Sequence, residues 1–155
     1  RLAVGAELNY VGQRDFDQGF GLQDYRTTTG HVSFYYRTLG EYYYQLDLGR
    51  YLAEDWGGTL NISRAFGNGV AIGVFATLTD MPFEDFGEGS FDKGFRIQIP
   101  FSALTGDRRT GGISRTIRPV LRDGGARVSV PGRLYGNVAG WHEPVLREQW
   151  GRFWR

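Results

Sequence analysis

The carboxylates of one acidic segment have the clearest potential for chemistry. Residues 80–88 read Asp-Met-Pro-Phe-Glu-Asp-Phe-Gly-Glu. A pair of carboxylates is the minimum for glycoside hydrolysis. The spacing here matches no acid/base motif, and it lacks the D-x-D-x-D-G order of an EF-hand loop. We interpret the segment as a solvated acidic loop. Weak divalent-ion binding, and carbohydrate cleavage by the acids of residues 80–92, are the alternatives.

Other catalytic and metal-binding patterns are missing from the sequence. The chain has no cysteine, and its two histidines, His31 and His142, lie far apart. Cysteine chemistry is therefore impossible, and a His-rich metal site is not expected. No G-x-S-x-G motif occurs, and the glycine-rich residues 106–112 lack the lysine of a phosphate-binding loop. We predict that the chain is not an enzyme and has no catalytic residue, metal or cofactor.

Arginine supplies a basic series in the second half of the chain. Residues 1–92 hold 13 acidic and 6 basic residues, a net charge of −7, whereas residues 93–155 hold 12 basic and 4 acidic residues, a net charge of +8. Arginine binds carboxylate and phosphate bidentately. The series therefore indicates either contact with an acidic polysaccharide or lipid phosphates, or salt bridges to the acidic first half. Its members are Arg108, Arg109, Arg115, Arg118, Arg122, Arg127 and Arg133.

Nucleic acid is excluded as a partner by two observations. The net charge of the whole chain is only +1, so no bulk positive field is present. No recognition motif accompanies the arginines.

The elements that must position these residues are β-strands, because apolar and polar residues alternate along much of the chain. Most of the predicted strands are about 8–10 residues long. This length exceeds the usual five or six residues of strands in soluble sheets and is close to the roughly 9–11 needed to cross a bilayer at a tilt. Six strands are predicted, over residues 2–10, 28–37, 42–49, 59–63, 70–79 and 94–101.

The connections and the end of the chain are less regular. Residues 38–41 and 66–69 are predicted tight turns, the second containing the Asn-Gly pair typical of hairpins. They alternate with longer links, which is the habit of outer-membrane barrels. Two Arg-rich strand candidates follow at residues 113–121 and 125–130, with Pro119 interrupting the first. Residues 143–154 are predicted to form a short helix. We divide the chain into barrel strands and loops over 1–133 and a C-terminal helical tail over 134–155.

The apolar and polar faces of the predicted strands fit either a soluble β architecture or a transmembrane barrel. A soluble sandwich or barrel turns its apolar faces inward, whereas a transmembrane barrel turns them to lipid and keeps a polar lumen. Aromatic residues at strand ends (Tyr10, Tyr36, Tyr42, Tyr44 and Trp56) favour the membrane barrel. The soluble architecture, binding a carbohydrate or small apolar ligand, is the alternative.

The period-two pattern assigns residues to each face. The predicted lipid face comprises Val4, Leu8, Phe34, Leu46, Leu48, Leu60, Ile62, Val70, Ile72, Val74, Leu78, Phe95, Ile97 and Ile99. The predicted lumen comprises Glu7, Asn9, Ser33, Arg37, Gln45, Asp47, Asn61, Ser63, Arg96 and Gln98.

Three blocks late in the chain resemble a known family. They are the FDKG of residues 91–94, the IP of residues 99–100 and the RPVLRDGGA of residues 118–126. Together they are similar to the C-terminal end of the YjbH family of outer-membrane exopolysaccharide proteins. The resemblance covers roughly a quarter of the chain closely, and the preceding hairpins fit in pattern. It transfers no catalytic residue.

The strand pattern and the resemblance together predict an all-β fold: an antiparallel transmembrane barrel, or the C-terminal portion of one. The pattern itself gives about seven or eight strands and a short C-terminal helix. The resemblance also implies a bacterial outer-membrane location, a lipoprotein or barrel parent, and a role in exopolysaccharide or capsule production or export. The expected partners are a polysaccharide, outer-membrane lipid and other export proteins. The candidates for polysaccharide contact are Arg37, Gln45, Asp47, Asn61, Arg96 and Gln98.

Overall fold

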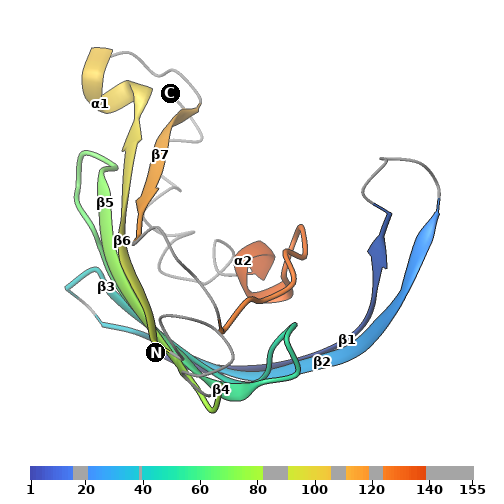
Figure 1. The fold of residues 1–155 in the computed structure, drawn as a ribbon. Coiled ribbons are helices and arrows are strands. Elements are labelled where there is room, and N and C mark those ends of the chain that lie inside the picture. The colour runs from blue at the N-terminus through green and yellow to red at the C-terminus, as the bar shows by residue number, and fades with distance from the viewer. Residues whose placement is uncertain (16–20, 39, 82–90, 106–110, 119–123, 139–155) are drawn as a thin grey trace.

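The computed structural model describes residues 1–15, 21–38, 40–81, 91–105, 111–118 and 124–138 (Figure 1). Almost all regular structure in these ranges is β-strand, with two five-residue helices. None of the described helices is long and apolar enough to cross a membrane. The elements are β1 (Leu2–Arg14), β2 (Leu22–Arg37), β3 (Tyr42–Arg50), β4 (Trp56–Ala65), β5 (Ala71–Thr79), β6 (Phe91–Pro100), α1 (Phe101–Thr105), β7 (Gly112–Ile117) and α2 (Leu134–Val138).

The strands form one antiparallel sheet in which each strand pairs with its neighbours in sequence, in the order β1 to β7. Figure 1 shows this sheet curled into a half-barrel, with β1 and β2 at one rim, β7 at the other and α2 inside the concavity. The predicted fold class, an all-β antiparallel barrel portion of about seven strands with a short helix, is confirmed.

The register keeps apolar residues on the convex face. Residues opposite one another in an antiparallel pair project to the same side, and one row joins Val4, Phe34, Leu46, Leu60 and Ala76 across five strands. Most of the row is exposed. Every residue of the predicted lipid face that lies in a strand has this orientation. Val70 directly precedes β5.

Aromatic residues border the convex face at both ends of the strands. Tyr36, Tyr42 and Tyr44 lie near the tight turns, where the guanidinium carbon of Arg64 is 5.0 Å from the ring centroid of Tyr42. Tyr10, Trp56 and Phe91 lie near the opposite ends and are exposed. The predicted placement of tyrosine and tryptophan near strand ends is thus what the sheet shows.

Glycines allow close approach where the sheet curves. A Cβ added to Gly49 would stand 2.0 Å from the carbonyl oxygen of Gly30, and one added to Gly57 would stand 2.2 Å from that of Leu78. Such distances are impossible for real side chains, so glycine is required at these two places in β3 and β4.

The end of the chain differs from the prediction. Residues 125–130 are not a strand, because Gly125 has a φ of +71° and the segment bonds to a turn and to side chains instead of to a strand edge. The strand predicted at 113–121 is β7, which ends at Ile117. Short helix α2 begins at Leu134. The helix predicted at 143–154 lies outside the described residues, and the division at residue 133 stays a prediction.

Candidate functional site

A segment that follows the sheet crosses its concave face. We call residues 124–138 the strap; they run as extended chain, turn at Pro131 and Gly132, and end in α2 (Figure 1). The start of the strap is fixed to the turn between β3 and β4. The Gly125 amide donates to the Asp55 carboxylate at 2.8 Å, and the Leu52 amide donates to the Ala126 carbonyl at 2.8 Å.

Arg127 fixes the middle of the strap to two carboxylates of the sheet. Its Nη2 is 2.7 Å from Oε1 of Glu7 on β1, and its Nη1 is 2.9 Å from Oδ2 of Asp47 on β3. Asp47 also accepts hydrogen bonds from Ser33 on β2 and from Gln45. The Asp47 side chain is 2% exposed and that of Arg127 15% exposed, so this ion pair is shielded from water.

The electrostatics at Arg127 favour its charged state. Burial alone would lower the pKa of the Arg127 guanidinium, but attraction to Asp47 and Glu7 outweighs burial and raises that pKa above its ordinary value. The three groups together keep a net charge of −1, so the two carboxylates present less negative charge to the concavity than the sequence suggests.

Arg133 makes a second connection to the same glutamate. Its Nε is 2.8 Å from Oε2 of Glu7, and its Nη2 donates to the Val128 carbonyl at 2.6 Å. One guanidinium thus holds the strap to β1 and also closes the turn within the strap. His31 lies beside this cluster, with its Nδ1 3.6 Å from Oε1 of Glu7 and its ring edge-on to Tyr51.

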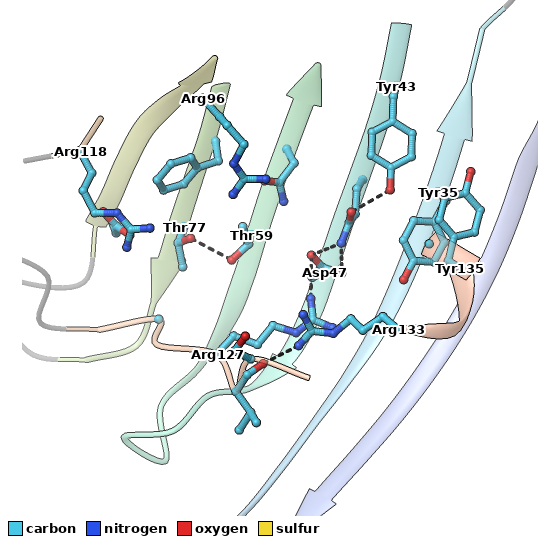
Figure 2. A pocket seen from close by; sticks show the side chains of 18 residues that line it. Tyr35, Tyr43, Asp47, Thr59, Thr77, Arg96, Arg118, Arg127, Arg133 and Tyr135 are labelled. Carbon is cyan, nitrogen blue, oxygen red and sulfur yellow. Dashed lines mark hydrogen bonds and ion pairs between the residues drawn. The ribbon is translucent and has the colours of Figure 1, made fainter. Parts of the chain in front are cut away.

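The end of the strap is held by aromatic stacking. The rings of Tyr135 in α2 and Tyr35 in β2 are parallel within 4°, and their centroids are 3.9 Å apart. Tyr43 of β3 lies 6.0 Å from Tyr135, also stacked. These three tyrosines form an aromatic wall, visible in Figure 2.

The strap and the sheet together enclose a groove of about 530 Å³ (Figure 2). One side carries the aromatic wall, and the other carries Arg96 of β6 and Arg118, which follows β7. Threonine hydroxyls line the floor, where Thr59 and Thr77 share a 2.8 Å hydrogen bond. The described residues that line it are Tyr35, Tyr43, Gln45, Asp47, Thr59, Asn61, Phe75, Thr77, Asp92, Arg96, Arg118, Gly125, Arg127, Val128, Ser129, Arg133, Tyr135 and Gly136.

The predicted contact residues fall in several places. Gln45, Asp47, Asn61 and Arg96 line the groove. Gln98 lines a smaller adjoining hollow of about 160 Å³, together with Gln45, Asn61 and Arg96. Arg37 is exposed beside Tyr43, with its guanidinium carbon 5.7 Å from the ring centroid, and does not line the groove.

The predicted basic series is divided by the structure. Arg118, Arg127 and Arg133 line the groove. Arg115 lies opposite Ile97 in the sheet and therefore projects from the convex face. For Arg127 and Arg133, the salt-bridge interpretation describes what the structure shows. Arg108, Arg109 and Arg122 lie outside the described residues, as does most of the acidic segment 80–88.

Several groove residues were not predicted from the sequence. Tyr35, Tyr43, Asp92 and Tyr135 all line it. The alternation of residues along each strand would have placed Tyr35, Tyr43 and Asp92 on the polar face of the sheet. No local pattern marks Tyr135. Within the described part of the chain, no group of three or more His, Cys, Asp or Glu side chains could hold a metal ion.

Comparison with known proteins gives two matches. Residues 1–140 match the model of the family described as "Exopolysaccharide biosynthesis protein YbjH". Over 138 residues the chain is 33% identical to the "Uncharacterized lipoprotein YjbH" of Escherichia coli (strain K12); the match covers 86% of this chain and 20% of that protein. The chain thus spans about a fifth of the length of this relative. No solved structure matches it.

Proposed function

The chain belongs to the YjbH family of exopolysaccharide biosynthesis proteins, and from this premise we propose that it forms part of an outer-membrane β-barrel that assists exopolysaccharide or capsule export. Its concave face would line the lumen, and its partners would be the polysaccharide, outer-membrane lipid and other export proteins. The role is non-catalytic: weak polar contacts at several sites let a hydrated chain slide past.

The orientation of the two faces carries this proposal. The convex face has an apolar centre bordered by aromatic residues, which is the pattern of a lipid-facing barrel wall. Strands β1 to β6 are 9 to 16 residues long, enough to cross the hydrocarbon layer, which takes about 9–11 residues at a tilt.

The concave face supports the polar-contact mechanism. One row joins Gly5, Ser33, Asp47, Thr59 and Thr77 across five strands. The concave face thus offers hydroxyl, amide and charged side chains beside the aromatic wall. A hydrated sugar chain would find both hydrogen-bonding and stacking partners on it.

The soluble alternative needs the opposite arrangement. A soluble sandwich or barrel that binds a carbohydrate or a small apolar ligand would direct the large aliphatic residues into its core. In this sheet they lie on the convex face, while buried polar residues such as Thr29 and Asp47 line the concavity. The geometry therefore favours the membrane barrel.

Membrane fractionation and export of the full-length protein test the proposal together. Asn61 lines the groove, and its neighbour Leu60 projects from the convex face. We expect Asn61→Trp to narrow the groove and reduce polysaccharide export, and Leu60→Trp to leave export unchanged. Both variants should stay in the outer-membrane pellet after a carbonate wash. Release of the wild-type protein by that wash, or normal export by Asn61→Trp, would contradict the proposal.

A further inference from the structure

We propose that the polysaccharide is acidic, and that Arg96 and Arg118 bind its anionic groups while its sugar rings pass along the aromatic wall. This inference rests on the proposed function and names the substrate class of the same groove.

The charge of the groove is the first argument. Among the described residues, four arginines line it (Arg96, Arg118, Arg127 and Arg133), against two aspartates, Asp47 and Asp92. Counting Glu7, which contacts the strap without lining the groove, still leaves a net charge of +1. A concave surface of one sign concentrates ligands of the opposite sign.

The second argument is that the four arginines of the groove differ in how fully their N–H donors are used. Arg127 and Arg133 are bound to Glu7 and Asp47 at 2.7–2.9 Å. Arg96 makes one long hydrogen bond, 3.4 Å to the Thr116 hydroxyl, and no ion pair among the described residues. A guanidinium offers five N–H donors, so most of those on Arg96 are open to a ligand.

Arg118 has a similar surplus of donors. Its Nη1 is 3.9 Å from Oδ2 of Asp92, which is beyond hydrogen-bonding distance. Its side chain is 36% exposed, and its guanidinium lies 5.5 Å from the ring centroid of Phe75. At this distance the ring provides a cation–π contact for the group, and Arg118 lines the groove (Figure 2) with most of its N–H donors unused. Planar N–H edges match carboxylate and phosphate oxygens.

The opposite side of the groove is suited to the sugar ring itself. The Tyr43 hydroxyl donates to Gln45 at 2.8 Å, and Gln45 in turn donates to Asp47. The orientation of the Tyr43 ring is therefore fixed by the same cluster that holds the strap. Apolar C–H faces of sugars pack on such rings. The groove thus pairs a stacking surface with cations, which fits an acidic sugar better than a lipid headgroup, since lipid borders the convex face.

Binding of defined oligosaccharides to the full-length protein in detergent tests the inference. The probes are hexagalacturonate, its methyl ester, which removes the charge and keeps the shape, and a phosphodiester-linked hexasaccharide. We expect an acidic probe to bind at least tenfold more tightly than the ester. Preference for the carboxylate or the phosphodiester probe identifies the anionic group. A charge-assisted hydrogen bond typically contributes enough for Arg96→Gln or Arg118→Gln to weaken this binding about tenfold.

Arg115→Gln is the matched control, because Arg115 lies three residues from Arg118 but projects from the convex face. It should leave the affinity unchanged, and neither groove variant should alter binding of the methyl ester. Equal affinity for acid and ester, or equal loss in the groove and control variants, overturns the acidic-sugar inference. The export defect of Asn61→Trp is measured separately, so it still decides the proposed function when the acidic-sugar inference fails.

Discussion

The shielded ion pair between Arg127 and Asp47 is the contact on which the strap depends most. Burying charges costs free energy that only good geometry and further hydrogen bonds offset, and Asp47 has both, accepting from Ser33, Gln45 and Arg127. Removing the Asp47 charge leaves Arg127 and Arg133 sharing the single carboxylate of Glu7, so the cluster keeps an uncompensated positive charge.

We therefore expect Asp47→Asn to lower the free energy of unfolding of the full-length protein by about 3–5 kcal/mol. The control is Glu54→Gln, which breaks the exposed Arg50–Glu54 pair of the β3–β4 turn and should cost about 0–1 kcal/mol. Urea unfolding in detergent measures both. Equal costs would mean that the Arg127–Asp47 pair adds nothing beyond a surface contact.

Tyr135 provides a second residue-level test, because its stack on Tyr35 is the contact that anchors α2. An aromatic pair contributes about 0.5–1.5 kcal/mol beyond its buried area. We expect Tyr135→Ala to speed protease cleavage within residues 124–138, and Tyr135→Phe to preserve protection. Leu134→Ala, at a neighbouring side chain that is 77% exposed, is the control; equal cleavage of both alanine variants would exclude an anchoring role for the stack.

At the scale of elements, the convex face of the strands makes a depth-dependent prediction. Val74 is 53% exposed near the middle of β5, and Tyr36 lies at the end of β2. In a lipid-facing wall, Val74→Arg should cost about 2–4 kcal/mol and Tyr36→Arg about 0–1 kcal/mol. Unfolding from lipid vesicles measures both. If the face bordered water, both costs would stay within about 0.5 kcal/mol.

The strands could be predicted because their signal is local. Alternation along each segment assigns a residue to one face, and the Asn68-Gly69 pair fixes the hairpin between β4 and β5. Strand ends were less predictable: the predicted strands ended at residue 10 and began at residue 28, whereas β1 extends to Arg14 and β2 begins at Leu22. The two strands stay paired as far as Arg14 and Leu22, so the hairpin is longer than its alternating apolar residues indicate.

The strap shows where local pattern misleads. Residues 125–130 alternate like a strand, but alternation cannot identify what the backbone bonds to. Here the partners are Leu52 and the Asp55 side chain, about 70 residues earlier. Tyr135 escaped prediction for the same reason, since its partner Tyr35 is 100 residues away. By contrast, Arg115 alternates in step with Ile113 and Ile117, which marks it as a residue of the apolar face. That pattern could have distinguished Arg115 from the arginines of the groove.

At the scale of the whole molecule, the sheet formed by the described residues has two edges without a partner strand. Among the described residues β1 pairs with β2 alone and β7 with β6 alone. Unpaired backbone groups cost several kcal/mol each in hydrocarbon, and the E. coli relative is about five times longer than the match. We therefore expect further strands of the full-length protein to cover these edges.

Hydrogen exchange of the full-length protein in lipid tests this expectation. Amides on the outer edges of β1 and β7 should be protected as strongly as those of β3 and β4, which are paired on both sides. Amides of the turn at Asn68 and Gly69 serve as the unprotected reference. Exchange at the β1 and β7 edges as fast as in that turn would show that the edges stay open.

The strap also sets an order of events during folding. Arg127 reaches a glutamate 120 residues earlier in the chain, and contacts of such long separation form late because loop closure costs more entropy as the loop lengthens. Until then the described side chains of the groove, with Glu7, carry three acids (Glu7, Asp47 and Asp92) against Arg96 and Arg118, a net charge of −1. Seating the two strap arginines changes it to +1. An unfinished molecule would therefore repel the polymer that we propose the finished one binds, so that premature engagement is prevented by the sequence of assembly itself.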